Sequence, residues 1–153
     1  MLKPGPGIRA ICPRHISANG IVLDIQVVYI SLALHPMGHP SDQEILQQSD
    51  ARCRALGMTG FLFRTGRYFV QVLEGTARDV WTVMTAIRRD PRHDILREWP
   101  PVLAPQRTFD GWSMGYGPLD RDGVLFMLSK NCPFDTPRDA LVDQLLRISA
   151  SQN

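Results

Sequence analysis

The sequence predicts a two-layer α+β sandwich in which two helices cover one face of a mixed sheet of about five strands. Stretches rich in β-branched and aromatic residues alternate with amphipathic helical stretches in the order β-α-β-β-α-β-β. Each helical stretch has one apolar face, which a sheet must cover, and a short turn joins the second strand to the third. A further helix follows. This order of elements is that of the ferredoxin-like arrangement.

Composition and charge exclude several classes of protein. The 153 residues suit one domain, and 44% apolar with 21% charged residues is ordinary for a globular chain. A net charge of +2 is too small to predict binding to nucleic acid or to an anionic membrane surface. The longest apolar stretch, 27–34, is shorter than the roughly 20 residues that span a bilayer. Three cysteines without CxxC spacing predict no disulfide framework, so we expect a cytoplasmic protein.

Three regions follow from the distribution of proline, glycine and apolar residues. Residues 1–22 lack a continuous apolar segment, so we expect a poorly ordered leader and no signal peptide. Residues 23–118 form the expected folded domain, and 119–153 a turn-rich connector and a helix with Thr136 as its N-cap. The apolar stripe of that helix consists of Leu141, Leu145 and Ile148.

The first strand and the first helix have clear signals. Residues 25–32 are rich in β-branched and aromatic residues and are apolar on both faces, which predicts a strand buried in a sheet. After a loop with two prolines, Ser41 is the expected N-cap of a helix, and Glu44 completes a capping box. Gly57 is the expected end of that helix.

The next strands and the second helix follow directly. Strands are expected at 58–64 and 68–74, with 65–67 as a hairpin turn. The second helix begins after Gly75 and ends near Asp90, because the residue before a proline disfavours the helical conformation. Its inward-facing residues are Val80, Val83, Met84 and Ile87.

Two further extended segments complete the expected sheet. They are 96–109 and 111–116. Three prolines keep the first of these at a sheet edge or partly irregular.

Two polar side chains stand out in the apolar strands. The period of two places Gln71 on the face that holds Phe69 and Leu73, where an unpaired amide costs a few kcal/mol. Tyr29 brings a phenol into the first strand, and its hydroxyl also needs a partner. The two groups are expected to bond to each other, to other protein groups, or to one ligand lying over the sheet.

Five short motifs in order between Gln26 and Tyr116 carry a family resemblance. They are Val28-Tyr29-Ile30-Ser31, Gly57-Met58-Thr59-Gly60, Phe69-Val70-Gln71-Val72-Leu73-Glu74-Gly75, Arg89-Asp90-Pro91-Arg92-His93 and Trp112-Ser113-Met114-Gly115-Tyr116. Each is weak alone, but together and in order they resemble the BLUF domain, a sensor of blue light using FAD. The family is a ferredoxin-like sandwich with its flavin between the two helices, which agrees with the order of elements above.

The resemblance implies roles for individual residues. Tyr29 would be the photochemical electron and proton donor, and Gln71 would relay the proton and then change its hydrogen bonds. Trp112 and Met114 would report the change to the output, although packing in a strand is the plain alternative for both. The remaining implied contacts of FAD, or of FMN or another flavin, are Ile45, Ser49, Arg52, Cys53, Asp90 and His93.

Two positions depart from the family's pattern. Cys53 stands where the family usually has an asparagine that bonds the flavin ring, with Arg52 where a second asparagine is common. Ala86 stands where arginine is frequent, and its neighbours Arg88 and Arg89 are candidates to compensate. At about 1 kcal/mol for each lost hydrogen bond, we expect flavin affinity to fall several-fold to tens-fold.

Cys53 also has other interpretations. An ordinary buried thiol packs as a small hydrophobe. A catalytic cysteine would need a nearby base, and no histidine is placed by the sequence to serve it. Pairs of Cys12, His15, His35 and His39 lie in the leader or a loop, so we expect no metal site.

The leading hypothesis is therefore a flavin-binding light receptor without enzymatic activity. It would signal by contact with a separate downstream protein, through its surface or its C-terminal helix, and homo-oligomers are compatible with the sequence. No nucleic acid or membrane partner is expected. The alternative is a BLUF-like interaction module that has lost its flavin.

Overall fold

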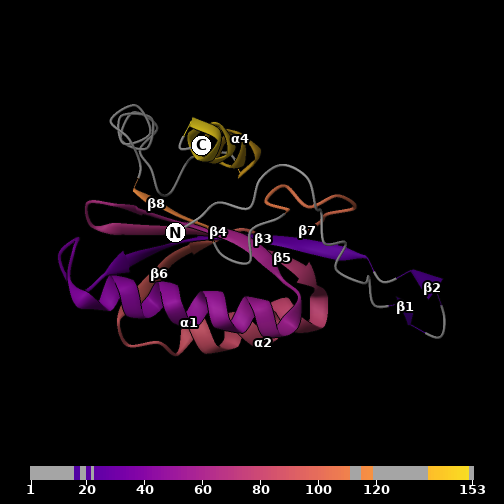
Figure 1. Cartoon of the computed structure of the whole chain (residues 1–153), viewed down its shortest axis with the longest axis horizontal. Coiled ribbons are helices and arrows are strands. Elements are labelled where there is room, and N and C mark those ends of the chain that lie inside the picture. The colour runs from indigo at the N-terminus through magenta and orange to yellow at the C-terminus, as the bar shows by residue number, and fades with distance from the viewer. Residues whose placement is uncertain (1–15, 18–19, 22, 111–114, 119–137, 152–153) are drawn as a thin grey trace.

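A computed structural model describes residues 16–17, 20–21, 23–110, 115–118 and 138–151. It is an α+β sandwich whose sheet has the strand order β6-β3-β5-β4-β8, with β7 paired to β3. The elements are β1 (Ile16–Ser17), β2 (Gly20–Ile21), β3 (Asp24–Ala33), α1 (Pro40–Leu56), β4 (Thr59–Thr65), β5 (Tyr68–Thr76), α2 (Ala77–Arg88), β6 (His93–Glu98), β7 (Val102–Leu103), β8 (Gly115–Pro118) and α4 (Arg138–Ser151). Helices α1 and α2 lie side by side against one face of the sheet, and α4 lies on the other face (Figure 1). The predicted ferredoxin-like fold class is confirmed.

The centre of the sheet is the antiparallel pair β3 and β5. Its register runs from Asp24 opposite Thr76 to Leu32 opposite Tyr68. β6 pairs antiparallel with the edge of β3 that faces away from β5, and β4 pairs antiparallel with β5. β8 pairs in parallel with β4, so the sheet is mixed, as predicted. Both central strands are therefore covered by a strand on each side.

The start of α1 corrects the prediction that Ser41 is its N-cap. The N-cap is His39, whose Nδ1 accepts the backbone N–H of Ser41 at 3.1 Å. Pro40 is the first helical residue, a position that suits its fixed φ and missing N–H. The C-terminal end at Gly57 was predicted correctly, and its φ of 64° is the left-handed conformation that glycine adopts most readily.

The later elements confirm most of the expected order. The β4–β5 hairpin turns at Gly66, which has a φ of 48°. The single extended segment expected at 96–109 is wrong in part: β6 ends at Glu98, only Val102–Leu103 pairs again, and a turn occupies 108–110. Pro100, Pro101 and Pro105 explain the interruption, because proline has no N–H to give to a strand ladder. Of the segment expected at 111–116, residues 111–114 lie outside the described residues.

Two apolar clusters hold the layers together. The cluster under α1 and α2 consists of Val27, Tyr29, Ile45, Cys53, Met58, Leu62, Phe69, Leu73, Val80, Val83, Met84 and Ile87. The cluster on the opposite face consists of Val28, Ile30, Phe61, Phe63, Val70, Val72, Trp99, Phe109, Leu141, Val142 and Leu145. The last three belong to α4, so this helix is part of the core. None of the described helices is long and apolar enough to span a bilayer.

Packing of α4 predicts a measurable loss of stability when one contact is removed. Leu145 is fully buried, so Leu145→Ala is expected to lower the free energy of unfolding by about 2–5 kcal/mol. The neighbouring Leu146 is exposed, and Leu146→Ala is expected to change it by no more than about 0.5 kcal/mol. Chemical denaturation of both variants decides the matter. Equal, small effects would mean that α4 does not pack on the sheet.

Candidate functional site

A narrow cleft lies between α1 and the C-terminal end of α2, above the helix-covered face of the sheet. Its lining residues are Tyr29, Ile45, Gln48, Ser49, Arg52, Gln71, Ile87, Asp90, Arg92 and His93. The four residues from α1 are spaced by three, one and three positions, which places them on one face of the helix. The two central strands provide the floor, and the turn between α2 and β6 provides the end wall.

The floor is a hydrogen-bonded pair between β3 and β5. Tyr29 and Gln71 lie directly opposite each other in the register, and the phenol hydroxyl donates to Oε1 of the amide. Both side chains are buried. Burial, with a smaller contribution from Asp90, raises the pKa of Tyr29 above its usual range. The phenol therefore keeps its proton at neutral pH and remains a donor.

His93 fixes the wall next to this pair. Its Nε2 lies 3.1 Å from the carbonyl oxygen of Ile87, and its Nδ1 lies 2.7 Å from the hydroxyl of Ser31. A carbonyl only accepts, so Nε2 carries the proton and Nδ1 accepts from Ser31. Burial lowers the pKa of His93, so the neutral ring is favoured. The ring also lies edge-on to Tyr29, with centroids 6.1 Å apart.

Arg92 bridges the mouth of the cleft. Its guanidinium bonds Asp90 through Nε at 2.9 Å and Nη2 at 2.6 Å, and Nη2 also donates to Oε1 of Gln48 on α1 at 2.7 Å. Glu44 lies 3.8 Å from Nη1. Hydrogen bonds from Arg92 lower the pKa of Asp90, so this carboxylate is ionised at neutral pH. The bridge ties α1 to the turn that follows α2.

Comparison with known proteins identifies this arrangement. The family model described as sensors of blue-light using FAD, BLUF, matches residues 25–115. The chain belongs to the BLUF family.

Individual relatives agree with this assignment. The photoactivated adenylate cyclase subunit alpha-like protein FB of Euglena gracilis is 36% identical over 109 residues, which is 71% of this chain and 10% of the relative. The chain thus spans about a tenth of the length of the curated relatives it matches. The dark-state structure of BlrB, a BLUF protein, is 26% identical with a TM-score of 0.66, over 86% of this chain and 98% of BlrB. Klebsiella pneumoniae BlrP1 with FMN and cyclic di-GMP is 28% identical with a TM-score of 0.58, over 84% of this chain and 34% of BlrP1.

Most of the site residues predicted from the sequence come together in this cleft. Tyr29, Gln71, Ile45, Ser49, Arg52, Asp90 and His93 all line it. Trp112 and Met114 lie outside the described residues.

Cys53 is placed differently from the other predicted contacts. It is fully buried in the apolar cluster beneath α1 and is not among the residues that line the cleft. Burial, together with the charge of Asp50, raises the pKa of its thiol to about 12. The thiol is therefore protonated at neutral pH, which does not suit a nucleophile.

Sequence reasoning missed two residues that bridge the mouth of the cleft. Gln48 and Arg92 meet across 44 positions of sequence, and such a contact has no local signature. The signal that could have found Gln48 is its helical spacing from Ile45 and Arg52. Arg88, considered as a substitute for the arginine missing at Ala86, bonds Glu98 instead, with Nε 3.1 Å from Oε2. The cations that line the cleft are Arg52 and Arg92.

The residues present fit a flavin in their chemistry. A flat heteroaromatic ring with polar edges needs apolar walls for its faces, together with donors and acceptors for its edges. Ile45 and Ile87 supply such walls, and Gln71, Arg52 and Asp90 supply an amide, a cationic donor and an anionic acceptor. The open volume among these side chains is about 20 Å³, so α1 and the Arg92 bridge must move apart to admit a ring.

The neutral state of His93 predicts a pH dependence of stability. Because its pKa is lowered in the folded state, the unfolded chain takes up a proton near the ordinary value of about 6.5 while the folded chain resists it. The contribution of His93 is therefore fully present above that value and is lost as the pH falls below it and through the lower pKa of the folded state.

Urea denaturation of the parent and of His93→Gln between pH 8 and pH 5 measures this contribution. The variant is expected to lose less free energy of unfolding over this range than the parent. Identical slopes in the parent and in His93→Gln would contradict the assignment.

Proposed function

We propose that this chain is a blue-light receptor that binds FAD non-covalently in the cleft between α1 and α2 and signals to a separate protein. The observation that carries the proposal is the buried Tyr29–Gln71 pair at the floor of a cleft with a flavin-compatible set of donors. Membership of the BLUF family supports it, as does the FMN named with BlrP1. FMN or another flavin would use the same ring contacts.

The residues of the chain have distinct tasks in this proposal. A bound flavin would supply the absorption of blue light and an acceptor for an electron. Tyr29 holds a proton on its hydroxyl, because burial keeps the phenol neutral. Gln71 accepts the hydroxyl proton in a hydrogen bond and has a donor and an acceptor on one amide. Exchanging these two ends rewires the hydrogen bonds without creating a buried charge.

The remaining cleft residues bind and orient. Ile45 and Ile87 would contact the faces of the ring and exclude water. Asp90, held ionised by Arg92, would accept from a ring N–H, and Arg52 would donate to a ring carbonyl. His93 holds the end wall in place through Ser31 and Ile87. We assign no catalytic turnover to any of them.

A second function is favoured by one specific observation. The open volume of about 20 Å³ and the bridge from Arg92 to Gln48 describe a closed cleft. A BLUF-like interaction module that has lost its flavin would keep the cleft in this state. Titration with FAD separates the two functions, because the receptor takes up flavin and the module does not.

The relay gives the sharpest test of the proposal. Loaded with FAD, the parent should shift its absorption to longer wavelength under blue light and return in the dark. Gln71→Leu should still bind flavin and should show no shift, because the variant has no amide to rearrange. Gln48→Leu, at the exposed rim of the same cleft, should keep the shift. A shift in Gln71→Leu equal to that of the parent would remove Gln71 from the mechanism.

A further inference from the structure

Two polar pairs lie on the same two strands. Tyr29 is opposite Gln71. Gln26, three residues before Tyr29, is opposite Glu74, three residues after Gln71. Three positions span about 10 Å of strand and reverse the direction of the side chain. The first pair therefore faces the cleft, and the second faces the side of the sheet that α4 covers.

Glu74 is saturated with hydrogen-bond donors. Its side chain is fully buried. Oε2 accepts from Nε2 of Gln26 at 3.0 Å and from the backbone N–H of Thr108 at 2.6 Å. Oε1 accepts from the hydroxyl of Thr59 at 3.2 Å and from the backbone N–H of Phe109 at 2.8 Å. A carboxylate offers about four acceptor positions, so no second arrangement of donors fits this one without breaking a bond.

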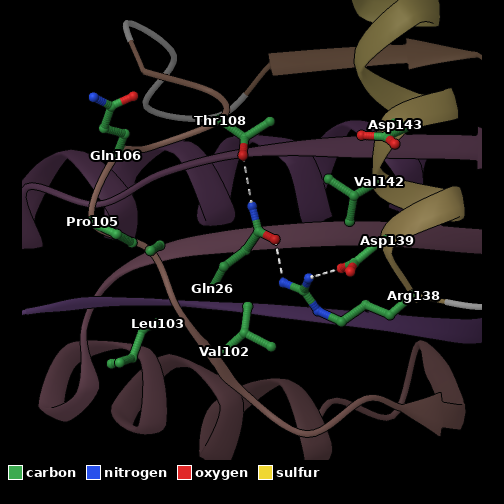
Figure 2. A pocket seen from close by; sticks show the side chains of 11 residues that line it. Gln26, Val102, Leu103, Pro105, Gln106, Thr108, Arg138, Asp139, Val142 and Asp143 are labelled. Carbon is green, nitrogen blue, oxygen red and sulfur yellow. Dashed lines mark hydrogen bonds and ion pairs between the residues drawn. The ribbon is translucent and has the colours of Figure 1, made fainter.

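These bonds reach two segments outside the central strands. The two backbone amides belong to the turn at 108–110, which leads along the chain toward β8. Gln26 also donates to the hydroxyl of Thr108 at 3.1 Å, and its Oε1 accepts from Nη2 of Arg138, the first residue of α4 (Figure 2). One buried pair thus holds both the turn and the start of the helix.

The first turn of α4 has room to move. A cavity of about 400 Å³ lies beside the Gln26–Arg138 contact, walled by Val102, Leu103, Pro105 and Val142 (Figure 2). Nε of Arg138 is buried and has no hydrogen-bond partner among the described residues. The guanidinium is otherwise held by Asp139, whose carboxylate lies 2.8 Å from Nη1. The free volume and the unsatisfied Nε at the same contact allow the first turn of α4 to adopt a second position.

We propose that Glu74, together with Gln26, is a positioning residue that couples the Tyr29–Gln71 pair to α4 and to the turn at 108–110. The meaning of this coupling as light output rests on the proposed function, whereas the coupling itself is a property of the chain without flavin. A change in the Tyr29–Gln71 pair alters the local pairing of β3 with β5. Glu74 has no unused acceptor position, so a shift of β5 against β3 must change its bonds to the amides of Thr108 and Phe109. The same shift reaches Arg138 through Gln26.

A double-mutant cycle in the full chain, kept dark and free of flavin, tests the coupling. Hydrogen exchange is followed by mass spectrometry in peptides that cover 104–110 and 138–151. Tyr29→Phe removes one hydrogen bond, worth roughly 0.5–1.5 kcal/mol, and should speed exchange in both peptides by about two- to tenfold. In a Glu74→Gln background the same change should leave exchange in both peptides as it is in Glu74→Gln alone. The side-chain NH₂ of Gln would stand where a carboxylate oxygen of Glu74 accepts two hydrogen bonds, so those two bonds are already broken in this background.

Two further variants separate the branches and control for general destabilisation. Arg138→Met cuts the link to α4, so Tyr29→Phe should still act on 104–110 and no longer on 138–151. Arg147→Met makes the same replacement on the exposed face of α4 and should leave both effects intact.

The outcomes are distinct. Equal effects of Tyr29→Phe in the parent and in Glu74→Gln, or no effect in either, would overturn the proposal. If Glu74→Gln does not fold, an undiminished effect on 138–151 in Arg138→Met overturns it instead. The proposed function is tested separately by the absorption of the FAD-loaded parent under blue light. If the absorption does not shift but the double-mutant cycle shows coupling, the light-receptor function is rejected and the coupling proposal stands.

Discussion

The antiparallel pairing of β3 with β5 places the two buried polar pairs of the sheet, and one of them is the floor of the cleft. Its register sets Tyr29 against Gln71 on one face and Gln26 against Glu74 on the other. A slip by one residue would turn each of these side chains to the opposite face, so the apolar residues between them fix the register. Val28 and Val72 pack beneath α4, whereas Val27 and Leu73 pack beneath α1 and α2. The same burial that stabilises the sheet also requires each polar pair to be satisfied internally.

The mouth of the cleft is held by more exposed contacts than its floor. α1 and the turn at 90–93 are held together across the mouth by Arg92, through bonds to Asp90 and Gln48 that are partly exposed. Such contacts are weaker than buried ones, so the mouth can open without disturbing the Tyr29–Gln71 pair. A sensor needs this division, because its ligand must enter while its relay stays in register.

The sequence predicted most helices and strands and most of the residues that line the cleft. It did not predict contacts between residues far apart in the chain. The strand at 25–32, the hairpin and the helix end at Gly57 follow from local signals and were predicted correctly. Tyr29 and Gln71 were singled out because both are polar groups within apolar strands; a bond between them was one of the alternatives left open, and it is the one the structure has. The N-cap at Ser41 was wrong, because Pro40 at the first helical position moves the cap to His39. Glu74 belongs to the 69–75 motif, but the motif did not predict its partners. Its bonds to Thr108 and Phe109 span more than thirty positions and depend on the path of a loop, which no periodicity predicts.

In the function we propose, light acts on the Tyr29–Gln71 hydrogen bond. The most direct measurement is the light-minus-dark infrared difference spectrum of FAD-loaded protein, with tyrosine or glutamine carrying ¹³C labels. The account predicts that a phenol C–O band and an amide C=O band both move on illumination, that each follows its own label, and that both are absent from the spectrum of Tyr29→Phe. An absorption shift without any movement of a tyrosine or glutamine band would contradict it.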